Sequence, residues 1–377
     1  MTSNTCPDGP KGIVIACSAP GSEALFAHER HAINAVARQI ALLKGFAFEG
    51  DLSAFKLDGE YLYYVPDDSL LLADASRMGI AGPKDFFGGV LPSRLAMTKV
   101  ITHNVIGASA FRPDDWPAEF PERVSGAVLP GYSTFSRTDT LQAADRLLRQ
   151  GPVRLKPPLA SRGREQQIAS SVSEVEAFLE RYQASNLEKN GFVLETNLAD
   201  IATLSVGIAD VGEIAIAYVG TQRITADNAG QPVYGGSDII AVRGGWEALA
   251  GLSLSSASAL AVAQARTYDA AMIECPGFFA SRRNYDIGQG TDWSGKWKSG
   301  VLEACWRIGG SSTAELAAMN VMQQYPDVQF VCASAVKAFG MNCQPPANAT
   351  VHFQGEDPDE GAITRYTAVT RISRKTA

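Results

Sequence analysis

The chain has 377 residues, of which 46% are hydrophobic and 19% are charged, and its formal net charge is −7. Its length predicts two or three domains, its composition excludes an intrinsically disordered chain, and its negative charge argues against a broad nucleic-acid-binding surface. No apolar run is long enough to span a bilayer and the polar N-terminus has no signal-peptide core, so we expect a cytoplasmic protein without a membrane partner.

The first third of the chain predicts an α/β domain. An apolar strand, a turn and a helix with apolar residues at helical spacing follow one another, which is the usual opening of such a domain. The expected elements are strands at 12–17, 61–66 and 69–74, a helix over 23–44, and a second helix near 93–104 that carries Lys99.

The middle of the chain predicts a second unit, which begins after a linker rich in proline and charge at 114–126. Ser173 and Glu176 have the spacing of a capping box at the start of a helix. The other expected elements are a helix over 139–151, a strand at 152–158 with Lys156 near its end, a polar loop with Ser161 and Gly163, and a strand that ends at Glu195.

The last part of the chain alternates apolar and polar residues as antiparallel strands do. We expect a hairpin that turns near 210–213, a helix over 255–274, and two strands joined by the loop "QGTDWSGKWK". A further helix is predicted over 312–324, and strands are expected over 328–340 and 362–372. The segments 221–236 and 235–245 are expected to border a substrate pocket.

Several short patterns fail as functional motifs. Gly290 to Lys296 match the first seven positions of a phosphate-binding P-loop, but Trp297 stands where a serine or threonine is required, so a hairpin loop is the better interpretation. His28 and His31 are three residues apart, not four as in zinc proteases, and we interpret them as surface polar residues. The six cysteines form no Cys-x-x-Cys pair, which predicts reduced thiols.

What remains is a set of charged residues at or within strands, and it suits nucleoside triphosphate chemistry. A lysine and the backbone of a glycine-containing loop can bind phosphates, while two carboxylates on neighbouring strands can hold Mg²⁺. Each residue also has a structural explanation, such as a strand-end lysine or a buried Glu–Arg pair. The set comprises Lys156, Ser161, Gly163, Glu195, Arg283, Asp286, Glu303 and Arg307.

The order of these residues resembles the ATP-grasp superfamily. The stretches that carry the resemblance are "VRLKPPLASRGREQQIASSVSEVEAFLERY", "GFVLETNLADIATLSVGI" and "RRNYDIGQGTDWSGKWKSGVLEACWRIGGSS", which together lie within residues 140–320. The chain also resembles an uncharacterised proteobacterial ATP-grasp-like family, a domain of unknown function.

The resemblance implies a mixed α/β and α+β fold in which two lobes clamp ATP. The implied units are a domain at 1–115 that precedes the grasp, a small lobe at 116–200 and a large lobe at 201–377 with a C-terminal segment. It implies an ATP- and Mg²⁺-dependent ligase that activates a carboxylate as an acyl phosphate for attack by an amine or a thiol. The implied partners are these small molecules and, as in other members of the superfamily, a second copy of the chain in a homodimer.

The resemblance also implies a role for each residue of the set. The phosphates would be contacted by Lys156, by Ser161 and Gly163 in the loop, and by Lys99. The adenine would lie near Glu195 and the ribose near Asp200. The metal would be bound by Asp286 and Glu303, and the phosphoryl group or the substrate acid would be faced by Arg283 and Arg307.

Two departures from the superfamily keep other functions open. The usual Glu-x-Asn of the last strand is Glu303-Ala-Cys305 here, and a thiol is a poor magnesium ligand, which leaves Asn284 as an alternative ligand. The phosphate loop "ASRGREQ" also has few glycines. The alternatives are a nucleotide-binding protein without ligase activity and a kinase-like phosphoryl transferase on the same fold.

Overall fold

A small parallel sheet begins the fold. The computed structural model describes residues 12–22, 24–50, 61–158 and 166–374. Strand β1 (Ile13–Cys17) lies between β2 (Ala47–Glu49) and β3 (Leu62–Pro66), and it pairs with both in parallel. Helix α1 (Ala27–Lys44) packs on this sheet through one apolar face, as its helical spacing predicts, and ends at Gly45 with a φ of 65°.

The segment after this sheet is more irregular than the sequence predicts. It contains β4 (Leu70–Leu71), helix α2 (Leu72–Arg77) and β5 (Gly89–Leu91), and β5 also pairs with β13 (Phe279–Ala280). The helix expected near 93–104 is wrong, since two 3₁₀ helices, η2 (Leu95–Met97) and η3 (Lys99–Ile101), occupy that stretch. Thr98 separates them because its backbone is extended and its side chain caps η3.

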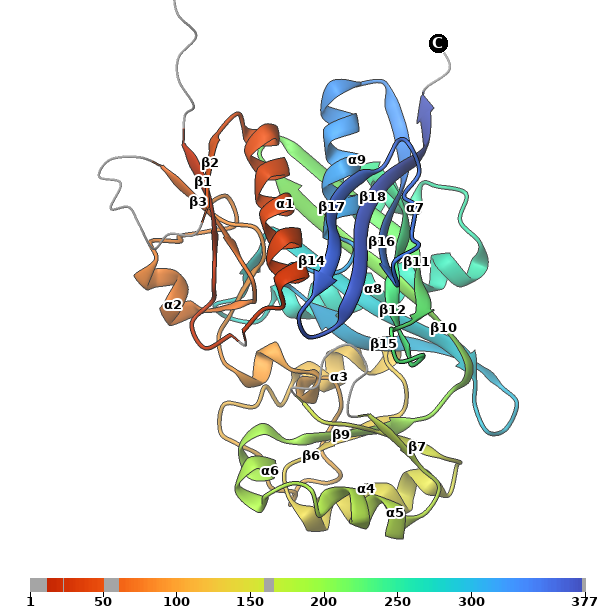
Figure 1. The fold of residues 1–377 in the computed structure, drawn as a ribbon. Coiled ribbons are helices and arrows are strands. Elements are labelled where there is room, and N and C mark those ends of the chain that lie inside the picture. The colour runs from red at the N-terminus through yellow and green to blue at the C-terminus, as the bar shows by residue number, and fades with distance from the viewer. Residues whose placement is uncertain (1–11, 23, 51–60, 159–165, 375–377) are drawn as a thin grey trace, which may run out of the picture.

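A four-stranded antiparallel sheet forms the small lobe at the lower end of Figure 1. Its strands lie in the order β6 (Gly131–Thr134), β9 (Phe192–Thr196), β7 (Val153–Lys156) and β8 (Gln167–Ala169). The lobe also contains α4 (Arg137–Leu148), α5 (Val172–Leu179) and α6 (Ala184–Asn190), and it is preceded by α3 (Phe120–Val124) and η4 (Ser125–Ala127). The capping box expected at Ser173 is wrong by two residues, because Ser171 caps α5.

An eight-stranded sheet forms the large lobe. Its order is β15-β14-β10-β11-β12-β16-β18-β17, and every neighbouring pair is antiparallel. The strands are β10 (Ala199–Val211), β11 (Ile214–Ala226), β12 (Pro232–Arg243), β14 (Arg282–Thr291), β15 (Trp297–Cys305), β16 (Val328–Phe339), β17 (Thr350–Asp357) and β18 (Gly361–Arg374). The predicted hairpins at 210–213 and 290–297 are confirmed.

The two faces of this sheet are covered by different helices. Helix α8 (Ser256–Ile273), next to the short α7 (Trp246–Ala250), packs on one face together with Val219 of β11. Helix α9 (Ser312–Gln324) packs on the other face with Tyr218 of β11, and α1 lies against α9 and β17 (Figure 1). Because successive side chains of a strand alternate between faces, each strand residue belongs either to the α8 face or to the α9 face.

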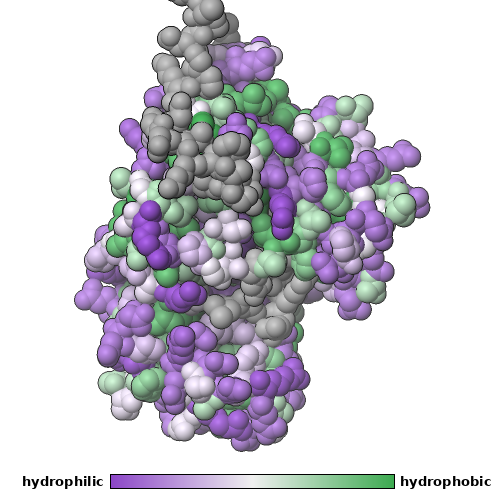
Figure 2. Space-filling view, turned by 60° about the vertical axis from the view of Figure 1, so that its left-hand side comes forward, coloured by the Kyte–Doolittle hydropathy of each residue, from purple (hydrophilic) through white to green (hydrophobic). Residues whose placement is uncertain are grey.

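Within the described ranges, no helix is long and apolar enough to cross a bilayer. Figure 2 shows that hydrophilic side chains cover much of the small-lobe end of the molecule on this side.

Candidate active site

A cavity of about 1190 Å³ opens between the small lobe and the α9 face of the large sheet. Its wall includes residues from α1, from β7 and β9 of the small lobe, from the large sheet, and from the turn between β17 and β18. The expectation that 221–236 borders a pocket is confirmed by the lining residues between Gln222 and Tyr234, whereas no residue of 235–245 lines this cavity. Five residues of the predicted set line it: Lys156, Glu195, Asp286, Glu303 and Arg307.

Asp286 and Glu303 lie directly opposite each other on the paired strands β14 and β15. Ser205 and Asn284 donate hydrogen bonds to the same oxygen of Asp286, with distances of 3.2 and 2.9 Å to Oδ1. Burial raises the pKa of Asp286, and the negative charge of Glu303 raises it further. Two carboxylates in this arrangement repel each other until a cation lies between them.

This donor set fits a magnesium ion. The described residues contain no group of three or more His, Cys, Asp and Glu side chains that could hold a metal. Mg²⁺ does not need such a group, because it is commonly bound by one or two carboxylates together with substrate phosphates and water. Asn284 lies opposite Cys305, and its amide oxygen already accepts a hydrogen bond of 2.9 Å from Tyr218, so its amide orients Asp286.

Two buried lysines approach the carboxylates from the small-lobe side. Lys99 of η3 places its Nζ 3.6 Å from Glu303 Oε2. Lys156 of β7 forms an ion pair with Glu195 of β9, and His103 Nε2 lies 3.3 Å from the other oxygen of Glu195. The charge of Glu303 acts on Lys156 as well, so both lysines lie within electrostatic reach of this carboxylate.

The ion pair keeps Glu195 ionised in a buried position. Burial alone would raise its pKa, but the charge of Lys156 outweighs this effect and, with His103, lowers the pKa to about 2. The Glu195 side chain is 1% exposed and holds the Lys156 ammonium group, while its expected place near an adenine stays a prediction.

An apolar slot lies next to these charges, where the chain crosses from β9 to β10. Leu129, Leu198, Ile201 and Leu302 line the cavity around this crossing. The crossing segment is held to the small lobe, because the backbone N–H of Asn197 donates to Pro152 at 3.0 Å. A slot of this kind is suited to a flat, apolar ring system bordered by backbone polar groups.

The expectation that Arg283 faces the phosphoryl group is wrong, because the alternation of side chains along β14 places Arg283 on the face opposite to the cavity. Arg283 lies on the α8 face, where its Nε is 2.8 Å from Asp269 Oδ1, and it does not line the cavity. Tyr285, which has the same parity on β14, donates to the same oxygen of Asp269 at 2.7 Å.

Arg282 takes the position on the α9 face that the sequence interpretation missed. It is 1% exposed, lines the cavity and forms two hydrogen bonds of 3.0 and 2.8 Å with Glu315 of α9. Burial opposes its charge, but Glu315 keeps the Arg282 pKa well above the usual value. The same guanidinium also donates to Ser311 at 3.2 Å, so Arg282 fixes the loop that leads into α9.

The other predicted site residues differ in their positions. Arg307 lines the cavity, with its Nε 3.7 Å from Asp68 Oδ1. Asp200 is exposed in an irregular stretch at the start of β10, has a φ of 49°, and does not line the cavity. Ser161 and Gly163 lie outside the described residues.

His28 is also placed differently from the prediction. The interpretation of His28 as a surface residue is wrong, because its side chain is fully buried and lines the cavity from α1. The polar residues around His28 in the sequence do not indicate that it is buried, because its partner, Asp357, lies 329 positions away.

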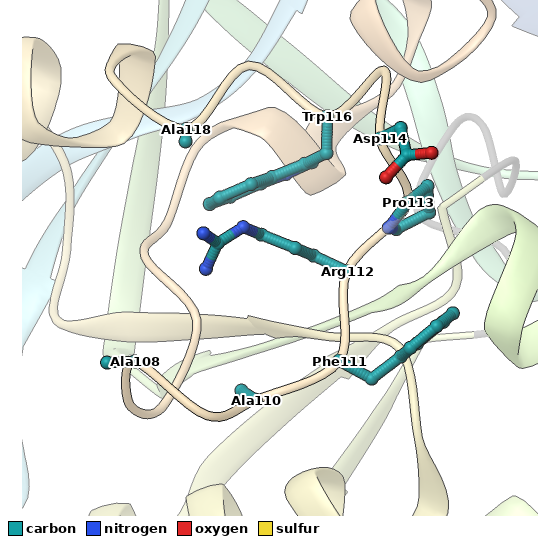
Figure 3. Close-up of a pocket in the computed structure, with 8 residues that line it drawn as sticks. All are labelled: Ala108, Ala110, Phe111, Arg112, Pro113, Asp114, Trp116 and Ala118. Atoms are coloured by element: carbon teal, nitrogen blue, oxygen red, sulfur yellow. The ribbon is translucent and has the colours of Figure 1, made fainter.

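A second hollow lies in the segment 108–118 and shares no residue with the predicted set (Figure 3). It has a volume of about 520 Å³, and Figure 3 shows Arg112 extending beside Trp116. Its charged side chains, Arg112 and Asp114, do not converge in that view. The larger cavity is therefore the candidate active site.

Structural comparison identifies the architecture. The chain is similar to an N5-carboxyaminoimidazole ribonucleotide synthetase solved as its ADP complex, with 10% identity, a TM-score of 0.55, and coverage of 96% of this chain and 93% of that chain. The ADP complex of the Staphylococcus aureus N5-carboxyaminoimidazole synthetase has 12% identity, a TM-score of 0.52 and coverage of 96% and 95%. A Campylobacter jejuni biotin carboxylase in complex with β-γ-ATP has 12% identity, a TM-score of 0.50 and coverage of 96% and 87%.

These proteins are ATP-grasp enzymes, so the predicted ATP-grasp fold is confirmed, while identities this low show the fold alone. No curated protein matches the sequence. One family model, with the description "Protein of unknown function (DUF3182)", matches residues 15–367. The chain therefore belongs to the DUF3182 family, and it has the ATP-grasp fold.

Proposed function

We propose that the protein is an ATP- and Mg²⁺-dependent ligase that activates a carboxylate as an acyl phosphate for attack by an amine or a thiol. The observation that carries this proposal is the convergence of Lys156, Asp286 and Glu303 in one cavity, with the buried Lys99 placing its Nζ 3.6 Å from Glu303 Oε2. The fold supports it, since the solved relatives include an ADP complex and a β-γ-ATP complex of ATP-grasp enzymes.

The residues divide the work according to their chemistry. Asp286 and Glu303 would hold the metal ion, which neutralises phosphate charge when it is bound. Lys99 and Lys156 are buried point charges that would bind phosphate oxygens, and Glu195 keeps Lys156 protonated and in place. The slot around Leu198 and Leu302 would take the adenine.

Arg307 is the arginine that would steady the transferred phosphoryl group or the substrate acid, since it lines the cavity with a half-buried side chain. The substrate oxygen would form a bond to the terminal phosphorus of ATP while the bond to the ADP oxygen breaks. The amine or thiol would then attack the acyl carbon, and inorganic phosphate would leave with the electron pair of the broken C–O bond.

A second candidate function is nucleotide binding without ligation. The specific observation that favours it is Cys305, which lines the cavity on the same face as Glu303 and offers a soft thiol where an oxygen donor would suit Mg²⁺. Arg282 lies 3.7 Å from the Cys305 sulfur and so makes the surroundings of this thiol still less suited to a cation.

Incubating the purified protein with ATP, Mg²⁺ and pools of carboxylic acids and amines or thiols separates the two candidates. The ligase releases ADP only when an acid is present, and the release accelerates when a nucleophile is added. Nucleotide binding with no ADP release from any pool supports the second candidate.

A further inference from the structure

One guanidinium group in the wall of the cavity has no direct partner in the protein. Arg365 of β18 lines the cavity with a half-buried side chain. Within the described ranges, it forms no hydrogen bond, no ion pair and no stacking contact with an aromatic ring. A guanidinium group carries five N–H donors and a permanent charge, so its partial burial without an acceptor costs free energy. Such a group is a candidate binding site for an anion.

Strand alternation places Arg365 on the same face of the large sheet as the metal ligands. Thr367, which has the same parity on β18, donates a hydrogen bond of 2.6 Å to Thr313 of α9. The side chains of Arg365 and Thr367 therefore both lie on the α9 face, where the cavity opens.

A neighbouring cation increases the need for an anion at this wall. Lys337 of β16 lies directly opposite Arg365, and like charges in such a pair repel each other. Glu360 forms an ion pair with Lys337, so its charge balances one of the two cations. The charge of Glu360 also acts on Arg365, but burial is the larger effect and lowers the Arg365 pKa. One of the two positive charges therefore remains without a carboxylate partner.

The other ionisable groups around Arg365 do not neutralise it. His28 of α1 and His352 of β17 both have pKa values of about 4, because burial and, with it, the charge of Arg365 disfavour their protonated forms. The carboxylate of Asp357 accepts hydrogen bonds from His28 and from backbone N–H groups of the β17–β18 turn. The described part of the chain thus offers Arg365 no carboxylate at ion-pair distance.

Arg365 is well separated from the centre where the acyl phosphate would form. Strand β14, which carries Asp286, and strand β18 have four strands between them in the large sheet. Neighbouring strands lie about 4.8 Å apart, so these two strands are on the order of 20 Å apart across the sheet. Tyr234 lies between them, since the charges of both Asp286 and Arg365 act on it. A carboxylate or a phosphate bound at the metal therefore does not reach Arg365.

We propose that Arg365 binds an anionic group, a carboxylate or a phosphate, of a substrate, and that this group is separate from the carboxylate activated at the metal. This inference rests on the proposed ligase function and narrows its substrates, because one of them then carries an additional anionic group. The planar fork of a guanidinium group donates two parallel hydrogen bonds to either kind of anion. The group belongs either to the acid, which then has two anionic ends, or to the nucleophile.

A purely structural role for Arg365 makes a different prediction. Loss of a guanidinium group that holds strands together would lower the free energy of unfolding. Because Arg365 has no partner to lose, we expect Arg365→Gln to unfold at the same urea concentration as the native protein or at a higher one. Arg371→Gln is the matched control, since Arg371 lies on the same strand, is exposed, stacks over Phe330 and does not line the cavity.

Titration calorimetry on the full-length protein with ADP and Mg²⁺ bound tests the anion site without turnover. The probes are inorganic phosphate and pairs of acids that differ in a second carboxylate: butanoate and succinate, hexanoate and adipate, octanoate and suberate, decanoate and sebacate. We expect phosphate to bind, or at least one diacid to bind more tightly than its matched monoacid. The dissociation constant of that probe should rise about tenfold or more in Arg365→Gln, as for the loss of a charge-assisted hydrogen bond, and stay unchanged in Arg371→Gln.

Turnover then identifies the substrate that carries the anionic group. Hydroxylamine, a small neutral nucleophile that attacks acyl phosphates, is added with ATP, Mg²⁺ and each acid of the pairs. A preference for a diacid that Arg365→Gln removes assigns the group to the acid. ADP release is next compared for nucleophiles with and without a carboxylate, such as β-alanine and propylamine, or 3-mercaptopropionate and propanethiol. A preference for the anionic nucleophile that Arg365→Gln removes assigns the group to the nucleophile.

Failure of the anion site and failure of the ligase are read separately. The anion site is overturned if Arg365→Gln binds every probe as tightly as the native protein, or if the native protein binds none of them. Hydroxamate formation together with either result keeps the ligase and rejects the site. Absence of hydroxamate and of ADP release with every acid rejects the ligase, while calorimetry alone still decides whether Arg365 binds an anion.

Discussion

The carboxylates of Asp286 and Glu303 are the residues on which the chemistry of the site depends. They face each other across β14 and β15, and the charge of Glu303 contributes to the raised pKa of Asp286. A fold that retains two mutually repelling carboxylates in a half-buried position gains nothing in stability from them unless a cation is bound there.

Replacing Glu303 by glutamine tests this arrangement. We expect Glu303→Gln to lower the pKa of Asp286 towards its ordinary value, because the neighbouring negative charge is gone. Turnover should fall on the order of 100-fold. ADP release at several Mg²⁺ concentrations measures the effect. Turnover equal to that of the native protein at low Mg²⁺ would exclude Glu303 as a metal ligand.

Lys156 is predicted to serve both the fold and the nucleotide. Lys156→Met leaves Glu195 buried without its cation, so we expect the free energy of unfolding to fall by about 3–5 kcal/mol, as for other broken buried ion pairs. The double variant Lys156→Met/Glu195→Gln removes the stranded charge. It should recover much of the stability but not the nucleotide affinity.

Urea unfolding and nucleotide titration of the three proteins separate the two roles. Native-like nucleotide affinity in the double variant would contradict the assignment of Lys156 to the phosphates.

The two adjacent arginines show how far the sequence predicts the site. Arg282, Asn284 and Asp286 have the same parity on β14, so strand alternation places Arg282, and not Arg283, on the face of the metal ligands. The alternation of residues along β14 is therefore enough to predict that Arg282 lies on the same face as Asp286. The sequence does not contain the identity of Glu315 as the partner, because that contact depends on how α9 docks on the sheet.

At the scale of elements, long periodic segments are predicted best. Helices α1 and α9 and the strands that carry Lys156 and Glu303 lie where their spacing predicts. The segment with Lys99 is not a continuous helix, since Thr98 caps a new turn, and a single polar residue outweighs the apolar pattern there. Lys99 still reaches Glu303, because η3 packs against β15.

The junction of α1 with β17 predicts a pH dependence of stability. Burial lowers the pKa of His28 in α1 and of His352 in β17 to about 4, from 6.5 in an exposed histidine. Between these two values the unfolded chain binds protons that the native protein does not. The contribution of these two histidines to the free energy of unfolding is therefore complete above pH 6.5 and is lost as the pH falls towards 4.

His352 provides the variant for this measurement. Its Nε2 lies 2.8 Å from Thr367 Oγ1, and glutamine can reach the same hydroxyl with a group that does not titrate. Urea unfolding of the native protein and of His352→Gln at pH 7.5, 6 and 5 should show a smaller loss of stability in the variant. Parallel losses in both proteins would mean that His352 titrates normally in the native state.

At the scale of the whole molecule, the site is assembled from segments that no local pattern connects. The cavity wall combines α1, the small lobe, the large sheet and the β17–β18 turn, and Asn228 links the β11–β12 loop to that turn through Glu360 and Ala362. The sequence predicts the fold through its resemblance to ATP-grasp proteins. It does not predict that the first helix and the last strands close one side of the cavity, because that contact forms only in the folded chain.

A ligase built in this way needs all its substrates for rapid turnover. We expect no ADP release with ATP and Mg²⁺ alone, release when an acid is added, and the fastest release with an acid and an amine or thiol, since each step requires the product of the one before. A coupled assay that follows ADP for each combination measures this order. ADP release that an amine stimulates without any acid would contradict activation of a carboxylate.

The convergence of Lys156, Asp286 and Glu303 on one nucleotide is tested most directly by a crystal structure with a non-hydrolysable ATP analogue and Mn²⁺ in place of Mg²⁺. We predict an anomalous peak for Mn²⁺ at about 2.0–2.2 Å from oxygens of both carboxylates, and phosphate oxygens within hydrogen-bonding distance of the Lys156 ammonium group. A nucleotide bound elsewhere, or a metal ion that contacts neither carboxylate, would contradict the account.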